Sequence, residues 1–301
     1  MRVSTGGTSL AVVEEEGDVR RLVEELIAEC GAVLVRGLDF TDVAGFHAVV
    51  EEFGAPLIES YRGGNTPRSK VGEGVFTSTE YPAQYEISLH NELSYAHWWP
   101  DRVYFGCLTA AESGGATPVC DGAALLDSLP DAVRSAFEDR GIAYHQHLHG
   151  GFGLGKSWQS TFETDDRDAV AEFLAEADAE HSWTDAGGLR VTQRRPATRP
   201  YQGHAVWFNQ ADQWHPSTLP SDEAAELLDL FDDPADLPHW VTYGDGTPIP
   251  ESDVDAVRVA ARGNRVAVPW RPGDLLVVDN MAVLHGREPY TGQRRVVVAM
   301  S

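Results

Sequence analysis

The stretch that decides the fold is the C-terminal one, WRPGDLLVVDNMAVLHGREPYTGQRRVVVAMS, residues 270–301. Two runs of strand-forming residues, Leu275–Val278 and Val296–Ala299, flank a turn-rich link, which predicts a final hairpin. His285 stands just before the link, and Arg294 stands at the start of the second strand. An imidazole there can bind a metal ion while the guanidinium binds a carboxylate beside it. A surface loop with a solvated pair of arginines would fit this stretch equally well, so the choice depends on the rest of the chain.

The charge balance limits the kinds of partner. The 301 residues carry 23 Lys and Arg against 47 Asp and Glu, which gives a net charge of −24. Nucleic acids and anionic membranes both bind basic faces, so neither is expected as a partner. A small anionic ligand stays compatible with this charge because it needs only one local arginine.

The cysteines and the apolar runs predict a soluble, cytoplasmic protein. Cys30, Cys107 and Cys120 are odd in number, lie among apolar residues and lack metal-type spacing, which favours buried free thiols in a reducing compartment. The start of the chain has no apolar stretch adequate for a signal peptide, and no apolar run approaches the length of a membrane span. The sequence leaves the oligomeric state open, and a homo-oligomer is compatible with it.

Helix and strand patterns alternate along the whole chain. Apolar spacing and caps predict helices at residues 18–30, 41–53, 121–140, 168–177, 222–231 and 253–262. Strand-forming runs lie at 32–35, 74–78, 87–93, 102–110, 117–120, 189–194, 205–208 and 264–269, and a long loop at 59–74. This distribution predicts a single domain over 1–301 that is mainly β with flanking helices. We expect an antiparallel double sheet with helices and loops inserted between its strands.

The triplet His90-Asn91-Glu92 is a candidate metal site. On a strand, positions i and i+2 share a face, so both outer side chains could reach one ion. A histidine from a distant strand would complete a face of two histidines and one carboxylate, which suits non-haem Fe(II) because it leaves positions open for oxygen and a cosubstrate. The triplet alone is a weak signal, since a chain this rich in acidic residues can contain one by chance.

A second histidine run competes with it. His145, His147 and His149 alternate, so they would lie on one strand face and could bind zinc or copper. Three ligands along one strand are spread widely, and no carboxylate or fourth ligand lies nearby in the sequence. A polar face that lines a cleft, or plain surface, explains this run better.

Five blocks together resemble a known family. They are STEYP (78–82), LHNELSY (89–95), GGATP (114–118), VWFNQ (206–210) and DNMAVLHGREPYTGQR (279–294). The chain resembles the TauD/TfdA family of Fe(II)- and 2-oxoglutarate-dependent dioxygenases from about residue 20 to its end. The closer likeness is to the syringomycin-biosynthesis-type, clavaminate-synthase-like branch, which includes amino-acid β-hydroxylases. The resemblance implies a double-stranded β-helix, or jelly roll.

The resemblance also implies the cofactors and the residues that hold them. The catalytic metal ligands map onto His90, Glu92 and His285, with Fe(II) as the metal and O2 as the oxidant. Glu92 argues against a halogenase, in which Gly or Ala opens a halide position. The residues that hold the cosubstrate 2-oxoglutarate map onto Thr117 and Arg294. Arg295 is the adjacent alternative, because strand alternation lets only one of the two arginines face inward.

The activity implied is hydroxylation of an aliphatic C–H bond after iron and O2 abstract a hydrogen atom. Cyclisation, desaturation or epoxidation can follow the same abstraction, and a jelly roll that only binds a ligand is the alternative outside enzymes. The expected substrate is an amino acid or an amino-acid-derived intermediate of specialised metabolism, either free or tethered to a carrier protein. The acidic surface disfavours an acidic carrier and so favours a free small molecule.

Substrate contacts are predicted from position and charge. Glu86 and Ser88 share the expected strand face of the triplet and could point into the cleft. Arg62 and Arg68 stand out as cations in the long loop and could bind a substrate carboxylate. Asn209, like Gln210 and Asn91 nearby in the motifs, could hydrogen-bond the substrate or brace the metal ligands.

Overall fold

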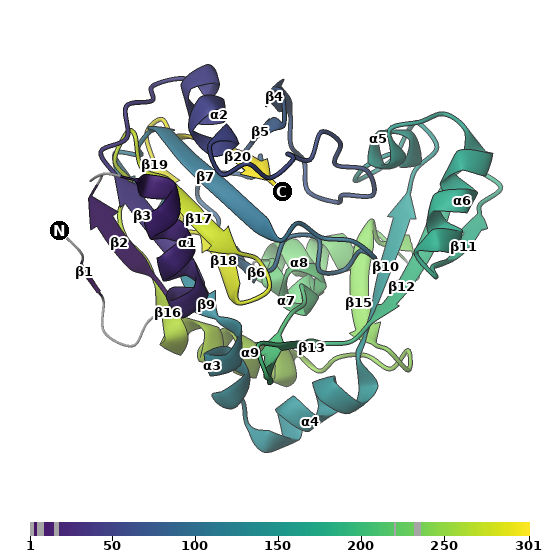
Figure 1. Ribbon diagram of the computed structural model, residues 1–301. Coiled ribbons are helices and arrows are strands. Elements are labelled where there is room, and N and C mark those ends of the chain that lie inside the picture. The colour runs from purple at the N-terminus through teal and green to yellow at the C-terminus, as the bar shows by residue number, and fades with distance from the viewer. Residues whose placement is uncertain (1–2, 5–8, 15–17, 220, 232–235) are drawn as a thin grey trace.

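The computed structural model describes residues 3–4, 9–14, 18–219, 221–231 and 236–301. Its largest sheet has eight strands in the order β1-β2-β3-β17-β7-β20-β5-β4 (Figure 1). These are Val3–Ser4, Ala11–Glu14, Ala32–Arg36, Leu275–Asp279, Arg102–Thr109, Arg295–Met300, Val75–Thr77 and Lys70–Gly72. All pairs are antiparallel except β2 with β3. β7 lies between β17 and β20, so the two runs that the sequence suggested as a hairpin do not pair with each other.

An extra strand, β18 (Val283–Arg287), lies between the two runs, and the sequence did not predict it. It belongs to a second sheet of four strands in the order β16-β9-β18-β6, whose other members are Arg265–Val266, Val119–Asp121 and Ile87–His90. The hairpin prediction was therefore wrong. Every residue of β18 is buried, so its sequence lacks the polar–apolar alternation that marks a half-exposed strand.

Alternation on the central strands of the large sheet builds two cores. Val277 packs with Val33 against the amphipathic helix α1 (Val19–Cys30), and α2 (Val43–Glu51) packs on the same side. Leu276 and Leu34 face the other way and pack with residues of the second sheet. The two sheets thus enclose the main apolar core between them, with helices outside.

A third sheet lies beside these two (Figure 1). Its order is β11-β12-β10-β15, with bounds Glu180–Trp183, Leu189–Arg195, Ile142–Leu148 and His239–Tyr243. Helices α5 (Trp158–Phe162) and α6 (Arg167–Glu176) pack on it through a separate apolar cluster around Trp158. This part of the chain is inserted between strands of the first two sheets, as the scattered strand pattern predicted.

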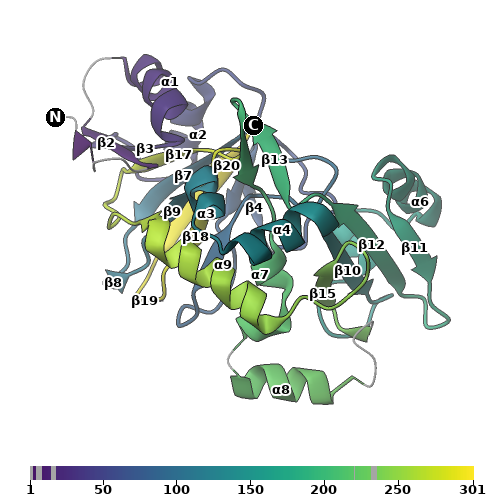
Figure 2. The same ribbon diagram turned by 90° about the horizontal axis from the view of Figure 1, so that it is seen from below.

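The remaining elements cover the ends of the sheets, and Figure 2, seen from below, shows α3, α4 and α9 on the side that faces the viewer. They are α3 (Gly122–Asp127), α4 (Asp131–Arg140), α7 (Ala211–Trp214), η1 (Pro216–Thr218), α8 (Ser221–Asp229), α9 (Glu251–Asn264) and the short strands β8 (Ser113–Gly114), β13 (Thr198–Tyr201), β14 (His204–Trp207) and β19 (Tyr290–Thr291). The helix predicted over 121–140 is two helices with Pro130 between them, as expected because proline disfavours helical geometry in the residue before it.

The chain is mainly β with flanking helices, as the sequence predicted. The three cysteines are free thiols, with Cys107 and Cys120 buried and Cys30 half-buried. None of the helices in the described ranges is long and apolar enough to cross a membrane.

Candidate active site

The site is built where β6 and β18 pair. Their antiparallel register sets His90 directly opposite His285, and the two imidazole centroids lie 4.5 Å apart. Glu92 joins them, with 3.8 Å between its Oε2 and His285 Nε2. All three side chains are buried, and one ligand atom from each lies within 4.8 Å of the others. The chain thus brings together three side chains that are up to 195 positions apart in sequence.

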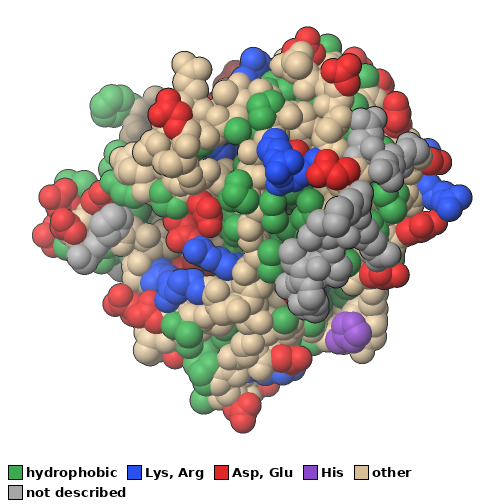
Figure 3. Space-filling model, turned by 90° about the vertical axis from the view of Figure 1, so that its left-hand side faces the viewer, with side chains coloured by type: hydrophobic (Ala, Val, Ile, Leu, Met, Phe, Trp, Pro, Cys, Tyr) green, Lys and Arg blue, Asp and Glu red, His purple; other side chains and the backbone are tan. Residues whose placement is uncertain are grey.

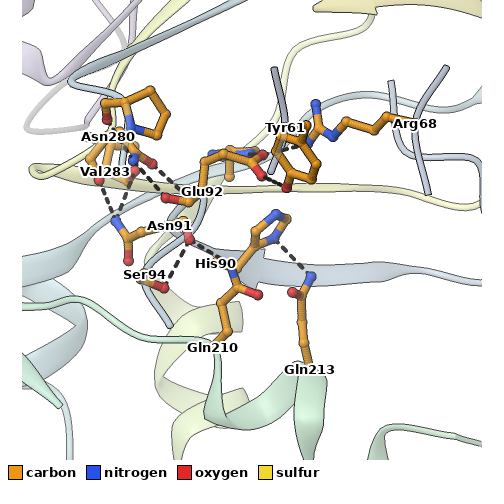
Figure 4. A network of polar contacts seen from close by, with 12 residues as sticks. Tyr61, Arg68, His90, Asn91, Glu92, Ser94, Gln210, Gln213, Asn280 and Val283 are labelled. Carbon is orange, nitrogen blue, oxygen red and sulfur yellow. Dashed lines mark hydrogen bonds and ion pairs between the residues drawn. The ribbon is translucent and has the colours of Figure 1, made fainter. Parts of the chain in front are cut away.

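Glu92 is not positioned by strand alternation, as the sequence had suggested. β6 ends at His90, and Glu92 lies in the turn that follows, so the expected strand over 87–93 was too long. Asn280 fixes the turn, because its Oδ1 accepts from Glu92 N at 2.7 Å and its Nδ2 donates to Glu92 O at 3.0 Å (Figure 4). Leu93 has a φ of 55°, a left-handed conformation rare for a branched residue. Such backbone strain persists only where surrounding contacts impose it.

The carboxylate of Glu92 is held by Tyr61 and Arg68. The Tyr61 hydroxyl donates to Oε1, and Arg68 Nη2 pairs with Oε2 (Figure 4). Burial alone would raise the pKa of Glu92, but Arg68 and the nearby histidines hold the pKa well below its usual range. The group is therefore an anionic carboxylate at any physiological pH and could serve as a metal ligand.

His90 presents a neutral imidazole. Burial, with the neighbouring His285 adding to it, lowers the pKa of His90 to about 3. Its Nδ1 lies 2.9 Å from the Ser88 carbonyl oxygen, with the Gln213 side chain packed against the same nitrogen. Both contacts engage Nδ1, so Nε2 is the nitrogen that can bind a metal. Both ring nitrogens of His285 are buried, and no described residue hydrogen-bonds either of them.

These surroundings fit a divalent metal. An unsatisfied buried imidazole nitrogen costs about 1–3 kcal/mol, and a metal bond removes that cost. Two nitrogens and one oxygen on one side of the site are the donor set that non-haem Fe(II) takes. Within the described ranges, these three residues form the one such cluster. His145 instead bonds Thr192 Oγ1 and Thr242 Oγ1, each at 3.0 Å, so the competing run is not a metal site there.

Arg294 and Thr117 line the same cleft as the two histidines. Arg294 donates from Nε to Gly115 O at 2.9 Å, and burial with the nearby Arg287 lowers its pKa to about 10. Thr117 Oγ1 accepts from Trp270 Nε1 at 3.2 Å. Arg294 is therefore a charged, partly desolvated guanidinium at neutral pH without a carboxylate partner among the described residues. Arg295, by contrast, is exposed.

Comparison with known proteins decides what this cluster belongs to. The model of the taurine catabolism dioxygenase TauD, TfdA family matches residues 4–300. The chain belongs to the TauD/TfdA family. It is therefore an Fe(II)- and 2-oxoglutarate-dependent dioxygenase, which confirms the resemblance of the five sequence blocks.

Two relatives in the TauD/TfdA family share about a third of their residues with this chain. The dapdiamide synthesis protein DdaC of Enterobacter agglomerans is 33% identical, over 98% of this chain and 89% of its own length. A clavaminate synthase-like protein of Arabidopsis thaliana is 31% identical, over 93% of this chain and 84% of its own length.

Solved structures extend the likeness to the fold. PvcB of Pseudomonas aeruginosa aligns with a TM-score of 0.54 and 14% identity, over 97% of this chain and 84% of its own. A second PvcB structure, described as an Fe, alpha-ketoglutarate dependent oxygenase from an isonitrile synthetic pathway, aligns with a TM-score of 0.53 and 15% identity over the same shares.

The residues expected to contact a substrate are dispersed. Glu86 and Ser88 line a wider cleft next to the site, although Glu86 pairs with Arg265 at 2.8 Å. Arg62 donates to Ala169 O and stacks on Phe173, and it lines neither cleft. Arg68 lies against Glu92. Asn209 lines the wider cleft, but its amide bonds Ala197 O and Ala211 N.

Sequence reasoning missed three residues that this TauD/TfdA site uses. Asn280 carried a signal, because it stands in the motif that contains His285. Tyr61 and Gln213 carried none, because each acts through a contact with a residue distant in sequence, 31 positions away for Tyr61 and 123 for Gln213. Gln210 Nε2 donates to Asn91 O at 2.8 Å. Of the two roles expected for these residues, this contact fits bracing of the candidate metal ligands and not a bond to substrate.

Proposed function

We propose that this enzyme hydroxylates an aliphatic C–H bond of an amino acid or an amino-acid-derived intermediate in specialised metabolism. It works as a single cytoplasmic domain on a small molecule, with no nucleic-acid or membrane partner. The observation that carries the proposal is the buried cluster of His90, Glu92 and His285 beside Arg294, whose guanidinium forms no ion pair within the part of the chain that the structure describes. The names of DdaC, a dapdiamide synthesis protein, and of PvcB, from an isonitrile pathway, support specialised metabolism.

Each residue has a role that follows from its contacts. His90, Glu92 and His285 would hold Fe(II), which together with 2-oxoglutarate and O2 supplies the chemistry that breaks an unactivated C–H bond. Asn280 and Tyr61 keep the carboxylate of Glu92 turned toward the histidines. Arg294 binds the distal carboxylate of 2-oxoglutarate, and the Thr117 hydroxyl adds a hydrogen bond. The burial of these side chains excludes water from the reacting atoms.

The jelly roll is part of this proposal. The eight-stranded sheet and the sheet of β16, β9, β18 and β6 enclose one core from two sides, and the likeness of the fold to PvcB supports a double-stranded β-helix. The metal ligands come from the smaller sheet and the turn after it, at the cleft between the two.

The test is anaerobic reconstitution with Fe(II) and 2-oxoglutarate, followed by O2 and a panel of amino acids and their derivatives. We expect succinate release that a true substrate accelerates, and a product heavier by one oxygen atom. A product lighter by two hydrogen atoms would instead show desaturation or cyclisation on the same iron centre. No visible charge-transfer absorption and no succinate would contradict the enzyme proposal.

A further inference from the structure

A second, wider cleft adjoins the proposed iron site. Thr79 and Ile87 line both, so the two spaces meet at β6. The wider cleft has a solvent-accessible volume of about 840 Å³. Pockets for drug-sized ligands span about 300–1,000 Å³. This space exceeds what a free amino acid next to the iron would fill.

The walls of this cleft are mostly apolar. Its lining includes Leu148, Trp207, Trp214, Leu237 and Pro238. His239 also lines it and packs edge-on against Trp214, with 5.3 Å between the ring centroids. Such a surface suits an acyl chain or an apolar side chain.

Most of the charges in the cleft are already neutralised. Arg258 pairs with Asp212 at 2.7 Å and with Asp255 at 3.0 Å, and Arg265 pairs with Glu86. Arg262 is exposed.

Lys156 differs from these arginines. It is half-buried, it forms no ion pair with any described residue, and its Nζ donates to the Gly64 carbonyl at 2.7 Å. Burial lowers the pKa of Lys156, and Glu163 only partly offsets this. Glu163 itself is occupied by Ser60 Oγ and Tyr61 N.

The backbone fixes Lys156 in the wall. His149 N donates to Lys156 O at 3.2 Å, and Gly155 packs so tightly on Pro238 that a Cβ there would lie 2.9 Å from the proline Cβ. Asn65 lines the cleft too, and no described residue bonds its side-chain amide. An ammonium group that forms no ion pair with the described residues and a carboxamide that none of them bonds, both beside apolar walls, complement a carboxylate and a peptide-like amide on one elongated molecule.

We propose that the wider cleft holds the non-reacting part of the substrate, with Lys156 as the anchor for its carboxylate. The substrate class is then an N-acylated amino acid rather than a free amino acid. The apolar part of the molecule lies along Trp214, and a carbon remote from the carboxylate reaches the iron. This inference deepens the proposed function and rests on it for the place of the iron.

The experiment measures binding of N-hexanoyl-L-alanine, its methyl ester and free L-alanine to the anaerobic Fe(II)–2-oxoglutarate protein by calorimetry. The ester keeps the shape of the acid and removes its charge. Wild type should bind the acid about tenfold or more tightly than the ester or L-alanine, since a charge-assisted hydrogen bond is worth about that factor. Lys156→Met should lose this preference and leave the ester unchanged, while Lys156→Arg should retain most of it.

Arg262→Met is the matched control, because it removes an exposed cation from the same cleft and should leave both affinities unchanged. The charge-transfer absorption of the Fe(II)–2-oxoglutarate complex reports the proposed function separately. If that absorption is normal but the acid binds no better than its ester, or Lys156→Met behaves like Arg262→Met, the inference is wrong. If the absorption is missing from wild type, the proposed function fails and this inference fails with it.

Discussion

Both imidazole nitrogens of His285 are buried, and no residue in the described ranges forms a hydrogen bond with them. Metal binding satisfies one of them, so replacing the ring should remove much of the affinity for the ion. We expect His285→Ala to weaken Mn(II) binding at least about a hundredfold in calorimetry and to abolish succinate release. His204→Ala changes an exposed histidine on β14 and should bind Mn(II) like wild type. Equal loss in both variants would contradict a specific role for His285.

Arg294 and Arg295 offer a matched pair at the start of β20. The first lines the cleft, and the second is exposed. Arg294→Ala should raise the KM for 2-oxoglutarate about a hundredfold, because it removes a charge-assisted contact to the distal carboxylate. Arg295→Ala should leave this KM within about twofold of wild type. The measurement is succinate release over a range of 2-oxoglutarate concentrations, and the reverse result would assign the anchor to Arg295.

At the scale of elements, the site depends on how closely β18 approaches β6. The register shifts between His285 and Arg287, and a Cβ at Gly286 would lie 2.5 Å from the Ile87 carbonyl oxygen. Gly286→Ala must therefore push the two strands apart. We expect it to lower the free energy of unfolding by about 1–3 kcal/mol and to weaken Mn(II) binding, measured by denaturation and calorimetry.

Gly263 provides the control for that change. It lies in α9, and nothing is within 4 Å of a Cβ added there. Gly263→Ala should leave metal affinity unchanged and stabilise the protein by up to about 1 kcal/mol, as alanine does in a helix. If Gly286→Ala bound Mn(II) as wild type does, the strand pairing would not set the geometry of the ligands.

Local signals explain which elements could be predicted. α1 runs from its Asp18 cap, which accepts from Arg21 N, to Gly31 at a φ of 73°, close to the predicted bounds. β18 was missed because every one of its residues is buried, so periodicity gave no sign of a strand.

Local signals also explain which parts of the site could be predicted. Motifs identified the candidate metal ligands, but the turn that presents Glu92 depends on Asn280, 188 positions away. Arg68 was predicted as a substrate contact from its charge alone. Its contact with Glu92 could not be predicted, because it depends on how the long loop folds over β6.

At the scale of the whole molecule, charge is distributed unevenly. Acidic side chains spread over the face in Figure 3, in keeping with a net charge of −24. The cleft that contains His90 and His285 is locally cationic instead. Its lining includes Arg68, Arg287 and Arg294. Backbone carbonyls of Tyr81, Pro82 and Tyr85 solvate Arg287. The protein thus concentrates cationic charge where an anionic cosubstrate must enter, which does not require a basic surface.

The global stability should depend on pH through histidines that fold in the neutral form. Burial, with Arg194 adding to it, lowers the pKa of His145 to about 4 from an ordinary value of 6.5. Between these two values the unfolded chain binds a proton that the folded chain does not. The contribution of neutral His145 to the free energy of unfolding is therefore fully present above pH 6.5. It falls as the pH drops toward 4, by at most about 1.4 kcal/mol per pH unit.

Chemical denaturation of the metal-free protein between pH 4 and 7.5 measures this slope. His145→Gln loses the stacking on Trp240, 4.4 Å between ring centroids, so it should be less stable at neutral pH. Its dependence on pH should nevertheless be shallower than that of wild type, because the group that takes up the proton on unfolding is gone. His204→Gln, at an exposed position, should keep the wild-type slope. A His145→Gln curve parallel to that of wild type would show that this imidazole is not held neutral by the fold.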